Sequence, residues 1–253
     1  MKNKLTALIV LIVSFLFIDQ LIKFGIKINF VEGQSQPLIG NWFVLNYIEN
    51  PGMAFGTTFG SSIWAKLGLS IFRIIAILGI GYFLWTEYRK DARMEFLVAI
   101  SLIFIGAIGN LIDSMFYDFL FSFDPCNYYN YMEGTGNFEN CVQTIRGQEY
   151  SRAVEVRHHG FLLGNVVDMF QFNVQWPNAI PYVGGKQVFP AIWNFADACI
   201  TSGVVLILIR NKTYFPKEKK INNSLKIPFH ITLVQYRKRD FPVRTSRGLI
   251  TCG

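Results

Sequence analysis

Four long apolar stretches stand out along the chain, separated by segments that mix polar and apolar residues. A bilayer core of about 30 Å is crossed by about 20 mostly apolar residues in a helix. The stretches that meet this requirement are Leu5–Ile22, Leu67–Trp85, Phe96–Ile112 and Phe189–Ile209. Each contains at most one charged residue. The pattern therefore predicts an α-helical polytopic membrane protein with four transmembrane helices.

The first apolar stretch also has features of a secretory signal, because Lys2 and Lys4 precede it. No Ala-x-Ala-like cleavage site follows, and the run continues through Asp19 to Lys23. We therefore expect a retained helix rather than a cleaved signal.

The two longest connecting segments differ in pattern. Residues 24–61 alternate apolar and polar side chains around several glycines, which predicts a small β-sheet cradle at the membrane surface. An insertion at about 115–163 is rich in Asn, Tyr, Phe and Gly and shows no strong period, and such long loops are uncommon unless they are functional. Cys126 and Cys141 lie in it. They form a disulfide or two free thiols, and the disulfide is favoured outside the cytoplasm.

Composition agrees with a membrane protein. The 253 residues are 51% hydrophobic and only 16% charged, whereas soluble domains contain about 25% charged residues. The net charge of +7 first suggests an acidic partner such as nucleic acid. However, residues 210–253 contain 11 Lys or Arg and 2 Asp or Glu, so the rest of the chain is slightly acidic. We expect a basic tail and no nucleic-acid partner.

The positions of Lys and Arg also predict the orientation. They gather at the N-terminus, in the turn 87–93 and in the tail after Ile209. Because short positively charged segments stay in the cytoplasm, both termini are expected to be cytoplasmic. The tail is then a cytoplasmic anchor near anionic lipids. Residues 24–66 and 114–188 are expected outside the cytoplasm.

Two carboxylates are the first candidates for chemistry. Asp197 lies in the fourth apolar stretch and Asp168 in the short apolar segment 164–170, both near the expected outer boundary of the membrane. An Asp inside a span costs about 2.5 to 3.5 kcal/mol on insertion scales. Two carboxylates that share a site hold one proton, so one acts as general base and the other as general acid. In the structural alternative, Asp197 pairs with Arg73 or bonds to Asn194, and Asp168 caps a turn.

Further polar residues are expected on the same side of the membrane. Asp19 and Lys23 form an i, i+4 pair at the end of the first span. Asn110 and Asp113 share one face at the end of the third span, either as substrate contacts or as groups that satisfy the helix end. Asn50 lies in a tight turn of the expected cradle. No two cysteines have the spacing of a zinc site, and we expect no metal or cofactor.

Five blocks of this sequence resemble lipoprotein signal peptidases, also called signal peptidase II, in order and topology. The resemblance covers about Leu5–Ile209, within a predicted peptidase domain at 1–209, and is interrupted by the insertion. The blocks are Asp19-Gln20-Leu21-Ile22-Lys23, Asn50-Pro51-Gly52-Met53-Ala54-Phe55-Gly56, Gly109-Asn110-Leu111-Ile112-Asp113, Val166-Val167-Asp168-Met169-Phe170 and Asn194-Phe195-Ala196-Asp197-Ala198.

The resemblance implies an intramembrane aspartyl endopeptidase in the bacterial cytoplasmic (inner) membrane, with its active site on the extracytoplasmic side. The implied substrate is a prolipoprotein whose Cys carries diacylglycerol, cleaved just before that Cys. We expect a monomer whose other partners are membrane lipids, with no metal and no cofactor. By this resemblance the catalytic pair is Asp168 and Asp197. The implied substrate-binding residues are Asn50, Gly52, Ala54, Phe55, Asn110 and Asn194, and the implied structural residues are Asp19, Lys23 and Asp113.

The chain departs from the family pattern in three places. Ser114 follows Asp113 where the family usually has Arg, Met53 stands where a small residue is common, and the insertion separates blocks that are normally close. One hypothesis is that Arg152 or Arg157 from the insertion replaces the missing charge.

Two other functions are compatible with the same polar residues. A small transporter or channel component would use Asp168, Asp197 and Arg73 along an ion path. A membrane scaffold without catalytic activity would instead display the aromatic insertion to a partner.

Overall fold

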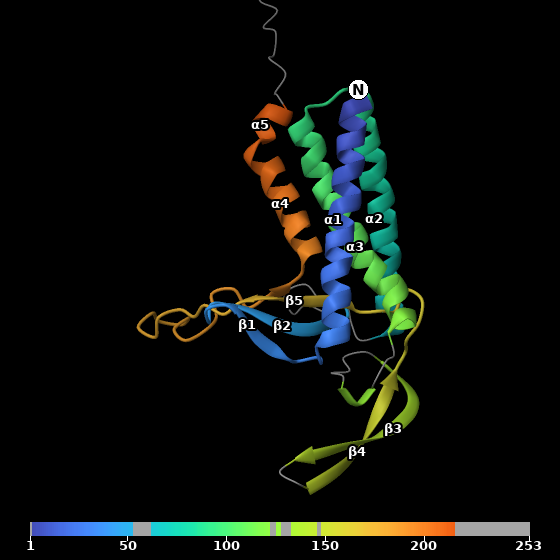
Figure 1. Cartoon of the computed structure of the whole chain (residues 1–253), viewed down its shortest axis with the longest axis vertical. Helices are drawn as coiled ribbons and strands as arrows, with labels where there is room; N and C mark the ends of the chain where they lie inside the picture. Colours follow the sequence, from blue (N-terminus) through green and yellow to red (C-terminus); the bar gives the residue numbers. More distant parts are fainter. Residues whose placement is uncertain (1, 53–61, 122–124, 128–132, 146–147, 216–253) are drawn as a thin grey trace, which may run out of the picture. The chain divides into compact units, whose positions relative to one another are not determined.

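The structure is a computed structural model that describes residues 2–52, 62–121, 125–127, 133–145 and 148–215. Its helices lie side by side along one direction (Figure 1). Among the described residues, three helices are long and apolar enough to cross a membrane and a fourth is shorter. The helices are α1 (Lys2–Asn29), α2 (Ile63–Arg89), α3 (Met94–Leu120) and α4 (Phe195–Ile209), followed by the short α5 (Asn211–Tyr214). The expected basic tail lies outside the described residues from 216 onward.

The first and third helices are longer than the sequence predicted. The helix α1 continues to Asn29, so the first residues of the expected cradle at 24–61 are helical. The helix α3 continues to Leu120 and includes the start of the expected insertion. Both extensions are held by tertiary packing, because Ile26 and Tyr117 are buried in one cluster with the sheet.

The fourth span was predicted to begin at Phe189, and this was wrong. Asn194 caps α4, and its side chain and that of Asp197 form a capping box that begins the helix at Phe195. The preceding residues instead include the short strand β6 (Ile192–Trp193). A helix that starts at a cap places Asp197 in its first turn rather than deep in an apolar run.

A four-stranded antiparallel sheet crosses one end of the helices (Figure 1). Its order is β1-β2-β5-β6, with β1 at Ser35–Ile39, β2 at Phe43–Asn50 and β5 at Val166–Phe172. The strands expected within 24–61 therefore supply only half of it. The pairing of β2 with β5 sets Asn50 opposite Val166 and Ile48 opposite Asp168.

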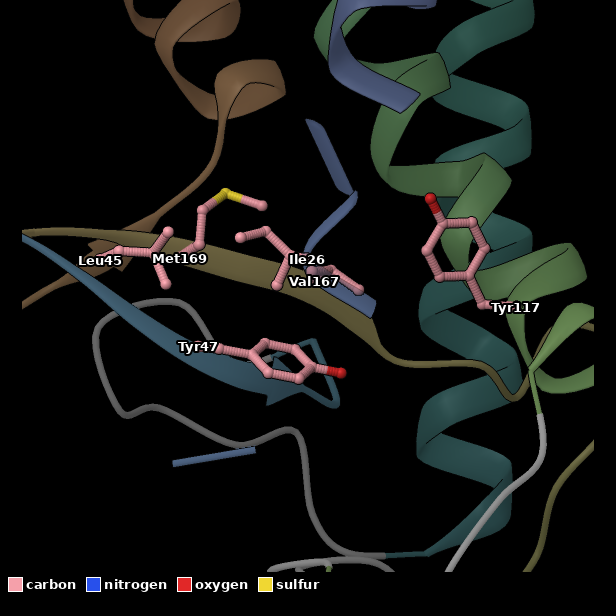
Figure 2. Close-up of a cluster of buried hydrophobic side chains, with 6 residues drawn as sticks. All are labelled: Ile26, Leu45, Tyr47, Tyr117, Val167 and Met169. Carbon is pink, nitrogen blue, oxygen red and sulfur yellow. The ribbon is translucent and has the colours of Figure 1, made fainter. Parts of the chain in front are cut away.

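A cluster of buried side chains joins this sheet to the helices (Figure 2). It contains Ile26 from α1, Tyr117 from α3, and Leu45, Tyr47, Val167 and Met169 from the sheet. Successive side chains of a strand point to opposite faces. Because Val167 and Met169 point into this core, Asp168 between them points to the other face of β5.

The helices α3 and α4 approach each other closely at two glycines. A Cβ atom on Gly106 would lie 2.2 Å from the carbonyl oxygen of Ala196, and one on Gly203 would lie 2.5 Å from that of Ala99. Only the absence of a side chain permits these backbones to meet. The contact brings the start of α4 next to the middle of α3.

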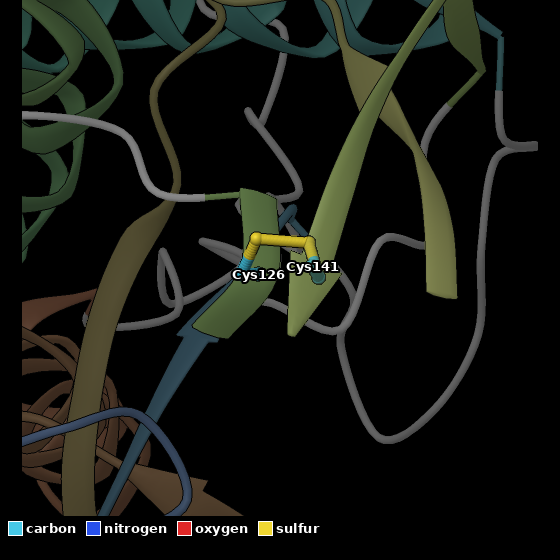
Figure 3. The surroundings of a disulfide bond; sticks show 2 residues. All are labelled: Cys126 and Cys141. Atoms are coloured by element: carbon cyan, nitrogen blue, oxygen red, sulfur yellow. A yellow bond between two sulfur atoms is a disulfide. The ribbon is translucent and has the colours of Figure 1, made fainter. Parts of the chain in front are cut away.

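The insertion has regular structure that the sequence pattern did not predict. The strands β3 (Gly134–Ile145) and β4 (Gln148–Arg157) form an antiparallel hairpin beside the short 3-10 helix η1 (Pro125–Asn127). A disulfide joins Cys126 in η1 to Cys141 in β3 (Figure 3). Most of β4 is exposed on both faces. Because neither face is buried, nothing imposes the apolar alternation by which a strand is predicted.

Candidate active site

Asp168 lies on β5, one of the two inner strands of the sheet, and is 1% exposed. Both oxygens of its carboxyl group accept hydrogen bonds from amide side chains. Asn50 Nδ2 donates to Oδ2 at 3.0 Å, and Asn194 Nδ2 donates to Oδ1 at 2.6 Å. The register of β2 with β5 provides the first bond, and the cap of α4 provides the second.

Asp197 lies in the first turn of α4 and is held from two sides. Its Oδ1 accepts from Asn110 Nδ2 of α3 at 2.8 Å, and its Oδ2 accepts from the backbone N–H of Asn194 at 3.3 Å. The positive end of the helix dipole also favours a carboxylate in this turn. The carboxylate is therefore oriented by α3 and by the cap of its own helix.

Asn194 connects the two carboxylates. Its Nδ2 group donates to Asp168 and to Asn110 Oδ1, the latter at 3.1 Å, while its Oδ1 accepts from the backbone N–H of Asp197 at 2.9 Å. The structural alternative thus holds in one respect, because Asp197 does bond to Asn194. Among the described ion pairs, none joins Asp197 to Arg73. The two carboxylates that are 29 residues apart in the chain share one amide network.

A second polar network lies directly behind the first. Lys23 Nζ contacts Asp113 at 2.8 Å and Asp19 at 3.2 Å, and all three side chains are fully buried. Lys23 also donates to Asn110 Oδ1 at 3.0 Å. The predicted pairing of Asp19 with Lys23 is confirmed, and Lys23 forms a second buried ion pair with Asp113.

The two aspartates of this network also hold backbone groups of the site. Asp19 Oδ1 accepts from the N–H of Ala196 at the start of α4, at 2.9 Å. Asp113 Oδ2 accepts from the N–H of Val167, next to Asp168, at 3.2 Å. The network therefore fixes α1 and α3 against both elements that carry the candidate catalytic residues.

Both carboxylates line a cavity of about 560 Å³. Of the residues that the resemblance implied as substrate contacts, Asn50, Gly52 and Asn110 line this cavity, whereas Ala54 and Phe55 lie outside the described residues. Asn194 contacts both carboxylates but is not among the described residues that line the cavity. The lining also includes apolar and hydroxyl side chains that the sequence did not single out, among them Phe172, Phe189, Ile192, Trp193, Ile200, Thr201 and Ser202.

The protonation of Asp168 follows from its surroundings. Burial, and in second place the charge of Asp197, raise the pKa of Asp168 to about 8, although hydrogen bonds from Asn50 and Asn194 act in the opposite direction. Asp168 therefore favours its protonated form near neutral pH. The cavity combines a proton donor with a second carboxylate on a different element.

The hypothesis that an arginine of the insertion enters the site was wrong. The guanidinium of Arg157 is buried against Asp118, with two bonds of 2.9 and 3.1 Å, and Arg152 lies on β4 opposite Cys141. The cation in the cavity lining is Arg73 of α2. The sequence feature that could have identified Arg73 is its position as the single charged residue of the second apolar stretch.

Comparison with known proteins agrees with this arrangement. The sequence model of the signal peptidase (SPase) II family matches residues 11–212, which include every element of the site. The chain belongs to the signal peptidase II family. The lipoprotein signal peptidase of Porphyromonas gingivalis is 37% identical over 205 residues, which cover 79% of this chain and 80% of that protein. The lipoprotein signal peptidase of Fusobacterium nucleatum is 28% identical over 215 residues, which cover 84% of this chain and 90% of that protein.

A solved structure shows the same fold. It is described as a bacterial membrane enzyme and superposes with a TM-score of 0.51 at 24% identity, over 85% of this chain and 94% of that one. The resemblance found in the five sequence blocks is thus confirmed, and this member of the signal peptidase II family is an aspartic peptidase. The comparisons do not favour a transporter component.

Proposed function

We propose that this chain removes the signal peptide from prolipoproteins whose Cys carries diacylglycerol and cleaves just before that Cys. In this proposal Asp168 and Asp197 are the catalytic pair. The relatives' name, lipoprotein signal peptidase, supports the class of substrate. The observation that carries the catalytic assignment is that carboxylates from β5 and α4 line one cavity and are bridged by Asn194.

The two carboxylates then act on one water molecule. Asp197 accepts a proton from the water as its oxygen attacks the scissile carbonyl carbon, and Asp168 donates its proton to the departing nitrogen. The peptide bond is replaced by a carboxyl group and an amine, and the pair again holds one proton. Asn50, Asn110 and Asn194 keep the carboxyl groups in place, since they bond to both oxygens of Asp168 and to Asp197.

The lining of the cavity suits a lipidated peptide. Apolar side chains such as Phe172, Trp193 and Ile200 face the same space as the carboxylates. Acyl chains are accommodated against such side chains and in the surrounding lipid, while the peptide segment before the Cys reaches the polar end. Since one chain supplies both carboxylates and their supports, the proposed enzyme functions as a monomer.

The proposed topology has four spans with both termini in the cytoplasm of a bacterium, in its inner membrane. The N-terminus and α5 lie at the end of the helices opposite the sheet (Figure 1). Near this end Lys4 of α1 bonds to Asp91 between α2 and α3 at 2.7 Å, and Arg210, which precedes α5, contacts Glu95 at 3.5 Å. The positive-inside rule assigns this end to the cytoplasm. The site then lies at the extracytoplasmic side, as does the disulfide, which is a bond that persists under oxidising conditions.

The helix α4 is the shortest of the proposed spans. Its 15 residues extend about 22 Å at 1.5 Å per residue, less than a bilayer core of about 30 Å. In the proposed orientation its capped N-terminus starts below the outer membrane surface. Asp197 then lies at the level where a lipidated Cys meets the edge of the acyl region.

Cleavage of a lipidated prolipoprotein by the purified protein in detergent tests this proposal. We expect Asp168→Asn and Asp197→Asn each to lower the cleavage rate by about 10²- to 10⁴-fold or more, with unchanged thermal unfolding. Asp91→Asn, at the opposite end of the helices, is the matched control and should cleave normally. An unlipidated peptide should not be cut. Full activity of either catalytic variant would refute the assignment.

A further inference from the structure

Arg73 is the one cation among the described residues that line the cavity. It lies on α2, which contributes none of the groups that hold the two carboxylates. Its Nη1 donates to Ser114 Oγ of α3 at 3.0 Å. A Cβ atom on Gly52 would lie 3.6 Å from its Nη2, so the guanidinium also lies beside the turn that follows Asn50.

The guanidinium has N–H donors that the described part of the chain leaves available. Arginine carries five N–H donors in a planar fork. The bond to Ser114 is the one hydrogen bond of the Arg73 side chain to the described part of the chain, and no described carboxylate lies within ion-pair distance of it. A charged residue inside a span has a high cost in free energy and needs a reason. Arg73 lines the cavity in which the proposed cleavage takes place.

The position of Ser114 explains how an arginine of α2 reaches this place. Ser114 is fully buried, and the family pattern that this chain resembles usually has Arg at that position. A serine is too small to fill the space or to supply a charge. Arg73 extends across from α2 and bonds to its hydroxyl group, so a guanidinium lies beside this residue although it comes from another helix.

We propose that Arg73 binds a backbone carbonyl oxygen of the prolipoprotein next to the scissile bond, and supplies from α2 the cation that the family pattern supplies from α3. This inference rests on the proposed function. A hydrogen bond from a charged donor to a carbonyl oxygen is about twice as strong as a neutral one. Such a bond would hold the peptide in register with Asp168 and Asp197.

The test compares Arg73→Gln, Arg73→Lys and the double variant Arg73→Gln with Ser114→Arg in cleavage assays with lipidated prolipoprotein. Loss of a hydrogen bond to a charged group predicts that Arg73→Gln raises KM by about 10- to 100-fold, with a smaller effect on kcat. Arg73→Lys should retain part of the binding, because it keeps the charge but not the fork. The double variant should recover most of it, because Ser114→Arg returns a guanidinium to the same place from α3.

Arg89→Gln provides the matched control, since it removes an exposed arginine from the far end of the same helix. It should leave KM and kcat unchanged. Thermal unfolding in detergent separates a loss of substrate binding from a loss of folded protein. If Arg73 only packs against its neighbours, Ser114→Arg should fail to restore the KM of the Arg73→Gln variant. Unchanged KM in Arg73→Gln, or loss of activity without rescue, would overturn the role of Arg73. The proposed function itself would fail if Asp168→Asn or Asp197→Asn stayed active, so the two failures are distinguishable.

Discussion

Replacement of Lys23 by Met tests whether the network behind the site is structural. In the wild-type protein Lys23 contacts Asp19 at 3.2 Å and Asp113 at 2.8 Å, with all three side chains at 0% exposure. The Met side chain is similar in length and apolar, so the substitution leaves two buried carboxylates without their cation.

The expected loss of stability follows from the burial. Removal of one partner from a buried ion pair costs about 3 to 5 kcal/mol, because the remaining charge stays desolvated. Since about 1.4 kcal/mol corresponds to a factor of ten, the folding equilibrium should shift by about two to four orders of magnitude. Replacement of Asp113 by Asn in the same chain removes one of the uncompensated charges and should restore part of this free energy.

The assay is equilibrium unfolding in mixed micelles, followed by tryptophan fluorescence. The matched control is Lys90→Met, which breaks the solvent-exposed contact of Lys90 with Glu87 and should have little effect on stability, as is usual for surface pairs. Any loss of cleavage by Lys23→Met should follow the loss of folded protein. Wild-type stability of Lys23→Met would refute the reasoning, and so would a fully folded variant that had lost cleavage.

Two further predictions concern the proton on the site and the insertion. Because burial and Asp197 raise the pKa of Asp168 to about 8, cleavage should fall as the pH rises through about 8, where the donated proton is lost. The same shift makes the folded state less stable as the pH rises from about 4, the usual pKa of Asp, to about 8. A cleavage rate that stays flat through pH 8 would contradict the first statement, and a free energy of unfolding that does not change with pH would contradict the second. Replacement of Cys126 and Cys141 by Ser removes a disulfide between residues 15 apart in the chain. Loss of a bridge of this span lowers the free energy of unfolding by about 3 kcal/mol, if the bridge acts by restricting the unfolded chain. The hairpin should therefore become sensitive to protease. Cleavage of prolipoprotein by that variant should stay at the wild-type rate, and its loss would show that the insertion acts in catalysis.

Local pattern was sufficient for much of the architecture. The long apolar stretches predicted α1, α2 and α3 because a membrane-spanning helix requires uninterrupted apolar residues, a property of the sequence itself. The i, i+4 spacing of Asp19 and Lys23 was likewise enough to predict their pairing. The five blocks were enough to identify the family, because they carry side chains that the shared site requires in a fixed order.

Features set by distant contacts were missed or misplaced. The hairpin β3–β4 has little apolar alternation because it is largely exposed, and its strands are defined by pairing with each other. The start of α4 was placed too early because Phe189 to Trp193 are as apolar as a helix core, and only the capping box of Asn194 with Asp197 and the pairing of β6 end that stretch.

The sequence by itself determined the membrane class and the family and singled out the two aspartates as candidates, because hydrophobic length and residue identity are local properties. Only the tertiary structure decided which polar groups meet. Asp168 is next to Asn50 because β5 pairs with β2, and next to Asn194 because α4 packs on α3. The arginine that enters the cavity is Arg73 rather than one from the insertion, because α2 lies opposite the small Ser114, whereas Arg157 is already paired with Asp118.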